Sequence, residues 1–215
     1  MVTVPNRPAS SRGATRMSRY EHDFTHMFAS LEKQIAATDN PRHRAILKNY
    51  RMHGLLEVAG RYDELLAPDK TVEQPHYRLH EGGQTVILDG MEQVRGFYQS
   101  LVAADALVMW VNRQEIAVHD HGFSGEVEFC QFLPGAMLGE SVFGSVQAGE
   151  DPGDVYLLTR TLAFVWPYDE RGRLIGEHVY EDGASRRIEK PDPADVITAA
   201  RAAELLAPEI AREIA

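Results

Sequence analysis

Residues 171–190, RGRLIGEHVYEDGASRRIEK, form the stretch that decides how this chain is expected to fold. Its first residues predict a turn, and the residues after them predict a long strand. Because successive side chains of a strand point to opposite faces, His178, Tyr180 and Asp182 are expected to share one face. The odd-numbered residues of 177–181 are expected to share the other face.

This row of polar side chains suggests an acid–base site. An imidazole, a phenol and a carboxylate on one strand face can move a proton and hydrogen-bond a developing oxyanion. The same row is also compatible with a half-solvated strand face or a dimer face. A shift of one residue in register would exchange the two faces of the strand. From the residues alone, both interpretations stay open.

The segments before this stretch predict an antiparallel sheet. Residues favourable to strands are concentrated in three earlier runs, at 107–118, 123–133 and 155–167. Turn sequences at 119–122 and 169–172 connect consecutive strands, and strands joined by tight turns pair antiparallel. Residues 134–154, rich in glycine and acidic residues, are expected to form a loop or flap.

Most of the remaining chain predicts helices. Apolar residues recur every three or four positions at 19–37, 42–66, 91–102 and after Pro193. Gly54 is expected to break the second helix, Asp89 to cap the third, and Pro208 to interrupt the last. Residues 71–80 and 85–88 are expected to be extended. Helices on one side of a curved antiparallel sheet make an α+β fold with an open mouth, where ligand pockets form.

Composition limits the class of protein. The chain has 215 residues, of which 44% are hydrophobic and 25% charged, as in a globular domain with a core. Its net charge of −10 argues against nucleic acid or an anionic membrane as a partner. No run approaches the roughly 18 apolar residues of a membrane span. The single cysteine, Cys130, excludes an internal disulfide, suits a cytoplasmic protein and is predicted to be buried and inert.

Three segments are expected along the chain. Residues 1–17 are basic and rich in Ser, Pro and Arg, without the apolar run of a secretory signal, and are expected to be a disordered leader. Translation can begin at Met1 or at Met17. Residues 18–190 are expected to form a single α+β domain, and residues 191–215 a C-terminal helical extension.

Two motifs resemble a known family. DGMEQVRGFYQSL at 89–101 and GRLIGEHVYEDGA at 172–184, with long strands between them, are similar to the SnoaL-like branch of the nuclear-transport-factor-2-like superfamily. That superfamily includes ketosteroid-isomerase-like and limonene-epoxide-hydrolase-like enzymes. The resemblance covers roughly residues 42–190, so an N-terminal helix is an addition to the family pattern. It implies a cone-shaped α+β barrel whose curved antiparallel sheet wraps around helices, and a homodimer formed through the sheet.

The resemblance also implies a role for one residue. In SnoaL-like cyclases a late-strand aspartate is the general acid/base that acts on an enolisable polyketide, and Asp182 matches it here. The Gln-Leu-Gly sequence that usually follows this strand in the family is absent. The segment of His76 and His80 commonly lines the pocket mouth in the superfamily, and related folds often direct a residue near Tyr62 into the cavity. Trp110, on a long strand, is a further candidate for ligand binding.

Two other groups have alternative interpretations. Arg160 interrupts an apolar strand and therefore needs a partner, either Glu126 or Glu128 in an ion pair or an anionic ligand. The His-x-His pair at 119–121 can bind a metal, but no third ligand with a recognisable spacing accompanies it.

The leading hypothesis is a cofactor-independent isomerase, cyclase or lyase that acts on a small, mainly apolar ligand. The chain has no glycine-rich nucleotide loop and no Gly-x-Ser-x-Gly elbow, which argues against nucleotide-cofactor enzymes and serine hydrolases of the usual folds. Asp182 is the expected acid/base, with Tyr180 and His178 as hydrogen-bond partners. The alternatives are a non-catalytic ligand-binding or homodimeric assembly protein, with Trp110 and Trp166 at its interface, and a metal-dependent enzyme that uses the histidine pairs.

Overall fold

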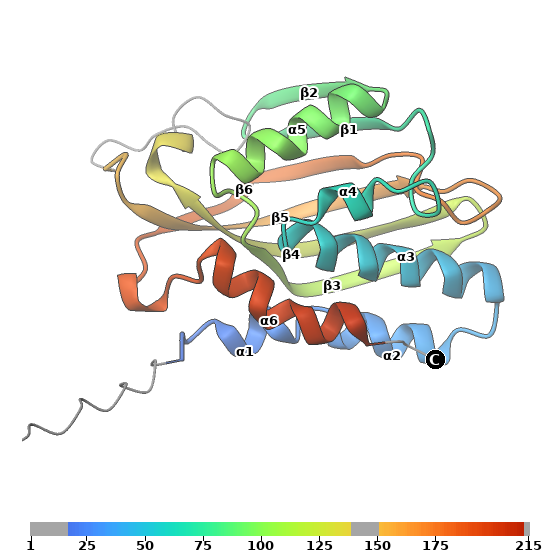
Figure 1. Cartoon of the computed structure of the whole chain (residues 1–215), viewed down its shortest axis with the longest axis horizontal. Coiled ribbons are helices and arrows are strands. Elements are labelled where there is room, and N and C mark those ends of the chain that lie inside the picture. Colours follow the sequence, from blue (N-terminus) through green and yellow to red (C-terminus); the bar gives the residue numbers. More distant parts are fainter. Residues whose placement is uncertain (1–16, 139–150, 213–215) are drawn as a thin grey trace, which may run out of the picture.

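The computed structural model describes residues 17–138 and 151–212, which form a six-stranded sheet with helices against one of its faces (Figure 1). The strand order is β2-β1-β6-β5-β4-β3. The strands are β1 (His76–Glu81), β2 (Gln84–Asp89), β3 (Met109–His119), β4 (Gly122–Pro134), β5 (Val155–Pro167) and β6 (His178–Glu189). The α+β class is confirmed. The sheet is antiparallel as predicted, except that β1 and β6 pair in parallel.

The helices cover the inner face of this sheet. They are α1 (Glu21–Thr25), α2 (Ala29–Ala37), α3 (Pro41–Val58), α4 (Tyr62–Leu65), α5 (Met91–Ala103) and α6 (Ala199–Ala211), with 3₁₀ turns η1 (Gly135–Met137) and η2 (Pro193–Asp195). Helix α5 lies over β2, α3 lies over β3 and β4, and α1 and α2 pack beside β3 (Figure 1). The predicted leader, apart from Met17, and most of the predicted loop at 134–154 lie outside the described residues.

Packing corrects two of the predicted helix boundaries. The helix expected over 19–37 is broken between α1 and α2, and the break places Met27 and Phe28 in the core. Gly54 does not break α3, because the helix continues to Val58. A Cβ atom at Gly54 would lie 2.5 Å from Cζ of Phe28, so glycine here permits the close approach of the two helical segments.

Two other local predictions are also wrong. Pro208 lies inside α6 and does not end it. Asp89 does not cap α5, because Gly90, with a φ of 87°, precedes the helix. The carboxylate of Asp89 instead accepts a hydrogen bond from Arg78 at 2.7 Å.

The pairing of β5 with β6 decides which β6 side chains face the helices. Phe164, on the apolar inner face of β5, lies opposite Val179. Paired residues of neighbouring strands point to the same face of a sheet, so Val179 and Glu181, which pair with Phe164 and Leu162, face inward. His178, Tyr180 and Asp182 therefore lie on the outer face, where Tyr180 and Asp182 are exposed. The prediction that these three side chains face a cavity is wrong.

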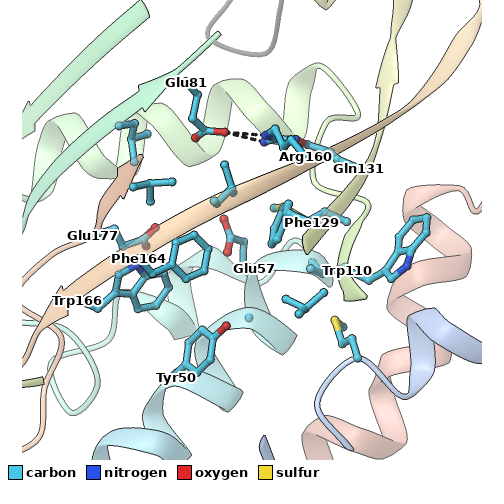
Figure 2. A pocket seen from close by; sticks show the side chains of 18 of the residues that line it. Tyr50, Glu57, Glu81, Trp110, Phe129, Gln131, Arg160, Phe164, Trp166 and Glu177 are labelled. Carbon is cyan, nitrogen blue, oxygen red and sulfur yellow. Dashed lines mark hydrogen bonds and ion pairs between the residues drawn. The ribbon is translucent and has the colours of Figure 1, made fainter. Parts of the chain in front are cut away.

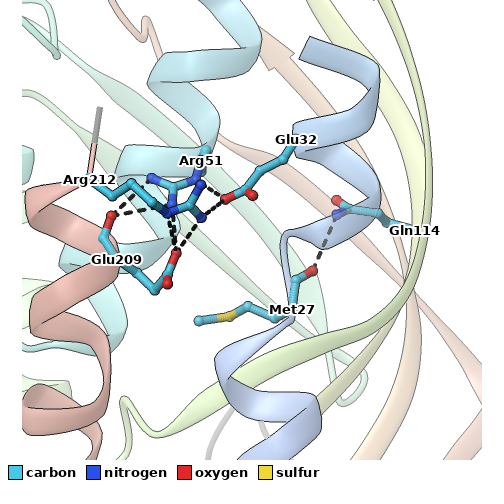
Figure 3. Close-up of polar contacts among 6 residues, drawn as sticks. All are labelled: Met27, Glu32, Arg51, Gln114, Glu209 and Arg212. Carbon is cyan, nitrogen blue, oxygen red and sulfur yellow. Dashed lines mark hydrogen bonds and ion pairs between the residues drawn. The ribbon is translucent and has the colours of Figure 1, made fainter. Parts of the chain in front are cut away.

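A buried guanidinium joins three helices. Arg51 on α3 donates to Glu32 on α2 at 2.6 Å, and to the carbonyl and carboxylate oxygens of Glu209 on α6 at 3.2 Å and 3.1 Å (Figure 3). Arg212 donates to the same carboxylate of Glu32 at 2.6 Å. These contacts hold the C-terminal helix against α3.

Cys130 is buried on β4, as predicted, and burial raises the pKa of its thiol to about 11. Its sulfur lies 3.7 Å from the hydroxyl oxygen of Thr159. Among the described helices, none is both long enough and apolar enough to span a lipid bilayer.

Candidate active site

A cavity lies between the inner face of the sheet and helices α3 and α5 (Figure 2). Its empty space is about 750 Å³ when the part that is open to solvent is counted. Its wall is mainly apolar, and its larger apolar members are Phe97, Trp110, Phe129, Leu162, Phe164 and Trp166. A cavity of this kind suits a small ligand with a largely apolar surface.

Five side chains with carboxyl, amide or guanidinium groups interrupt this wall, namely Glu57, Glu81, Gln131, Arg160 and Glu177. They come from α3, β1, β4, β5 and the segment before β6, which are far apart in the sequence. Figure 2 shows the carboxylates of Glu57 and Glu177 near the middle of the view, and Glu81, Arg160 and Gln131 together in its upper part.

Glu57 is held in the cavity by the geometry of α3. Tyr50, Gly54 and Glu57 are spaced by four and three residues, so they share one helix face, and all three line the cavity. The side chain of Glu57 is 17% exposed, and no described residue donates a hydrogen bond to it. Nε2 of His53 lies 3.7 Å from Oε2 of Glu57.

The surroundings of Glu57 favour its neutral form. Burial raises the pKa of this carboxyl well above its usual value, and the nearby carboxylates of Glu177 and Glu81 raise it further. A protonated carboxyl group is a hydrogen-bond donor as well as an acceptor. Glu57 is thus equipped to donate a hydrogen bond, or a proton, to a ligand oxygen.

Glu177 lies at the end of a buried hydrogen-bond chain. Its Oε1 accepts from the hydroxyl of Tyr98 at 3.0 Å and lies 3.0 Å from Nε2 of His53. The hydroxyls of Tyr77 and Tyr98 are 3.2 Å apart. Burial, and then the charge of Glu177, raise the pKa of both tyrosines, so their phenols remain protonated donors. The phenol of Tyr77 also interacts with Glu177, and the side chain of Glu177 lines the cavity.

Arg160 makes an ion pair, but with a partner other than the predicted ones. Its Nε and one Nη donate to Oε2 of Glu81 at 3.0 Å and 2.7 Å, and the same Nη donates to Oε1 of Gln131 at 3.0 Å. The two expected partners bind other residues, because Glu126 pairs with Arg113 and Glu128 accepts from Asn112. The sequence therefore predicted that Arg160 forms a structural ion pair, but it did not predict Glu81 as the partner.

The three predicted catalytic side chains lie outside the cavity. Asp182 accepts a hydrogen bond from the backbone N–H of Ala184 at 3.0 Å, and Tyr180 is 45% exposed. The rings of Tyr180 and His178 contact histidine rings on β1. Tyr180 stacks on His80 with ring centroids 4.9 Å apart, and the ring centroids of His178 and His76 are 5.4 Å apart. The structure brings these four rings together on the outer face of the sheet.

The other predicted ligand-binding residues differ in position. His76 and His80 are on the outer face and do not line the cavity, so their predicted place at its mouth is wrong. The ring of Tyr62 lies parallel to that of Tyr98 at 6.5 Å and is not part of the cavity wall. Trp110 and Trp166 are buried and line the cavity, which contradicts their alternative placement at a subunit interface.

Sequence reasoning did not single out Glu57, His53, Tyr98 or Glu177 as site residues. The sequence did contain a signal for Glu57. It is a charged residue between apolar residues of the second predicted helix, which is unusual for a solvated carboxylate. Glu177 belonged to the decisive stretch but to the opposite strand face. Within 17–138 and 151–212, no three histidine, cysteine or carboxylate side chains are grouped as a metal site requires.

Comparisons with known proteins show a likeness of fold. No protein-family model and no curated protein matches the chain. The solved structures to which it is similar include an NTF2-like protein and a protein with a cystatin-like fold, at 10% and 11% sequence identity. An NTF2-like protein from Anabaena variabilis is 10% identical with a TM-score of 0.45, over 69% of this chain and 96% of that one.

Two neighbours have described roles of their own. An epoxide hydrolase/cyclase-like enzyme of pyran ring formation in polyether salinomycin is 13% identical with a TM-score of 0.40, over 76% of this chain and 99% of that one. A phenazine biosynthesis-related protein from Pseudomonas aeruginosa is 9% identical with a TM-score of 0.40, over 77% of this chain and 85% of that one. These likenesses concern the arrangement of the chain and do not establish an activity.

Proposed function

We propose that this protein is a cofactor-independent enzyme that moves a proton on a small, mainly apolar ligand, as an isomerase, cyclase or lyase does. The observation that carries the proposal is the carboxyl of Glu57, which is buried in an apolar cavity without a hydrogen-bond donor among the described residues. Glu177 lines the same cavity in a different environment. Two acidic groups whose environments differ in this way are typical of a paired acid and base.

The two carboxyl groups have complementary roles in this proposal. Glu177, oriented by Tyr98 and His53, removes a proton from a carbon of the ligand. Glu57, in its neutral form, donates to the oxygen on which negative charge develops. Trp110 and the other apolar side chains of the wall hold the body of the ligand. These residues replace Asp182, Tyr180 and His178 as the proposed catalytic groups.

Exchange of carbon-bound protons tests the proposal without knowledge of the natural ligand. The probe is 4-tert-butylcyclohexanone in D₂O, and loss of its α-proton signals in NMR spectra gives the rate. We expect the protein to accelerate exchange, and Glu177→Gln and Glu57→Gln each to lower the accelerated rate by about a hundredfold or more. Asp182→Asn, on the outer face, is the matched control and is expected to leave the rate unchanged.

Two results would contradict this assignment. If the α-protons of the ketone exchange no faster with the protein than in buffer alone, proton transfer on this class of ketone is rejected. Equal rates in wild type, Glu57→Gln and Glu177→Gln, with all three folded by circular dichroism, would reject the two carboxyl groups as its agents.

A second candidate function is assembly through the outer face of the sheet, in a homodimer. This face has exposed apolar side chains at Ile87, Val165 and Tyr180, which are 57%, 44% and 45% exposed. His76 and His80 lie beside them on β1. Exposed apolar side chains grouped on one face favour a protein interface, and such an interface is compatible with catalysis in the cavity on the opposite side of the sheet.

A further inference from the structure

The ion pair in the cavity wall has no part in the proton transfer proposed above. Glu81, Arg160 and Gln131 all line the cavity, and each is more than nine-tenths buried. A buried ion pair is often no more stabilising than apolar side chains of similar volume, because both charges lose their hydration. Its presence in the wall of an apolar cavity is therefore better explained by ligand recognition than by stability.

The ion pair presents one carboxylate oxygen of Glu81 without a partner. Both hydrogen bonds from Arg160 end on Oε2, and no donor to Oε1 is found among the residues that the structure describes. Gln131 holds the guanidinium from the other side, and its own amide donates to the carbonyl of Ala106 at 2.7 Å. An ion-paired carboxylate accepts hydrogen bonds and donates none. Oε1 can therefore satisfy a donor group on a ligand.

The charges of the cavity also restrict the ligand. The charge of Arg160 is offset by Glu81, and burial raises the pKa of Glu57, which favours its neutral form. Glu177 would repel an anion, and Arg160 is the only lysine or arginine among the described residues that line the cavity. Burial of an ionised ligand group without a partner is costly. These features favour a neutral ligand over a carboxylate or a phosphate.

We infer that Glu81 selects a neutral ligand with a hydroxyl group, which donates a hydrogen bond to Oε1 while the apolar body of the ligand fills the cavity. Arg160 and Gln131 are positioning residues that orient the carboxylate of Glu81. This inference rests on the proposed function, because the same cavity must hold the ligand whose proton Glu177 removes.

Binding of matched probes tests the inference. The probes share one frame and differ in one group: tert-butylcyclohexane, 4-tert-butylcyclohexanone, trans-4-tert-butylcyclohexanol, the corresponding amine and the corresponding carboxylate. Fluorescence of Trp110 and Trp166 reports binding, because the chain has two tryptophans and both line the cavity. We expect the alcohol to bind about tenfold more tightly than the ketone or the hydrocarbon, and the carboxylate to bind most weakly.

A variant assigns this preference to Glu81. In Glu81→Gln the amide oxygen still accepts from Arg160, and the amide N–H group can donate to the ligand. The affinity for the ketone should therefore rise and the affinity for the alcohol should fall. We expect the alcohol-to-ketone preference to fall by about tenfold. Glu21→Gln is the control, because Glu21 is a buried carboxylate bound by Arg201 and does not line the cavity. It is expected to keep the wild-type preference.

The outcomes separate this inference from the proposed function. Wild-type protein that binds the alcohol no more tightly than the ketone, or that binds the ammonium probe more tightly than the alcohol, overturns the inference alone. The inference is also overturned if Glu81→Gln keeps the wild-type alcohol-to-ketone preference. If this variant does not fold, the order in which the wild type binds the probes decides whether the inference holds. If no probe binds, including the hydrocarbon, the cavity is not a ligand site and the proposed function fails as well.

Discussion

Glu57 and Asp182 show that position, more than residue type, gives a carboxyl group its chemistry. Asp182 is exposed on the outer face of the sheet, where its carboxylate binds a backbone N–H of its own strand. Glu57 lies in an apolar cavity next to other carboxylates, which raises its pKa. A buried neutral carboxyl can donate a proton, whereas an exposed carboxylate at neutral pH cannot.

Glu57 is expected to make stability depend on pH. Its pKa in the folded protein is raised above the usual 4.5, so the folded state binds the proton more tightly than the unfolded state does. Its contribution to stability is therefore fully present below about pH 4.5 and is lost as the pH rises toward the raised value. Glu57→Gln removes this dependence. Relative to this variant, the wild type should lose free energy of unfolding over the pH range from about 4.5 upward.

Denaturant unfolding of both proteins across this range measures the difference. Other titrating groups are common to the two proteins and cancel in the comparison. A difference in free energy of unfolding that stays constant with pH would show that Glu57 ionises in the folded state as it does in the unfolded chain.

Helix α3 shows how an element is shaped by what packs on it. Glycine inside a helix is unfavourable by about 1 kcal/mol relative to alanine, and Gly54 on this ground predicted a break. The helix nevertheless continues to Val58. Phe28, from the junction of α1 and α2, packs against Gly54 and occupies the space that a side chain at position 54 would need. The same helix face carries Tyr50 and Glu57 into the cavity, so this packing also helps to place the proposed acid.

Two glycine-to-alanine variants are expected to change stability in opposite directions. Gly54→Ala introduces a Cβ 2.5 Å from Phe28 Cζ, and overpacking of this kind costs about 1 to 3 kcal/mol. Gly96→Ala, on α5, meets no atom within 4 Å and should stabilise by up to about 1 kcal/mol through helix propensity. Thermal or denaturant unfolding of the two variants measures this contrast. A Gly54→Ala protein as stable as Gly96→Ala would show that the contact with Phe28 is not limiting.

The whole molecule has one helix-covered face and one outer sheet face with exposed apolar side chains. The helices and the C-terminal α6, which Arg51 ties to α3, enclose the cavity side (Figures 1 and 3). On the other side Tyr180 stacks on His80, and Ile87 and Val165 are exposed. If a second copy covers this face, the aromatic and histidine side chains first considered for catalysis have a role in association.

Tyr180→Glu is expected to weaken self-association through this face. A charge at the centre of an apolar interface is buried without a partner, which is costly. The mass in solution, followed by light scattering over a range of concentrations, should shift toward that of a single chain. Val102→Glu is the control, because Val102 is 41% exposed on α5, on the covered side. A wild type with the mass of one chain at every concentration would reject association through the sheet.

The sequence by itself determined the elements of this protein to a large extent. Alternation and turn residues predicted β5 at its observed bounds and β3 and β4 within about two residues, because strand patterns and tight turns are local properties. Apolar spacing predicted α5 in the same way. The buried thiol of Cys130 also followed from its apolar neighbours.

Only the tertiary structure decided which side chains meet. Local alternation shows which residues of β6 share a face, but both faces are polar, and the choice between them came from pairing with the apolar face of β5. Glu57, Glu81, Arg160 and Glu177 converge from separate segments, and no local pattern relates their positions. Burial then gives Glu57 a pKa that its residue type alone does not have, because desolvation depends on everything packed around it.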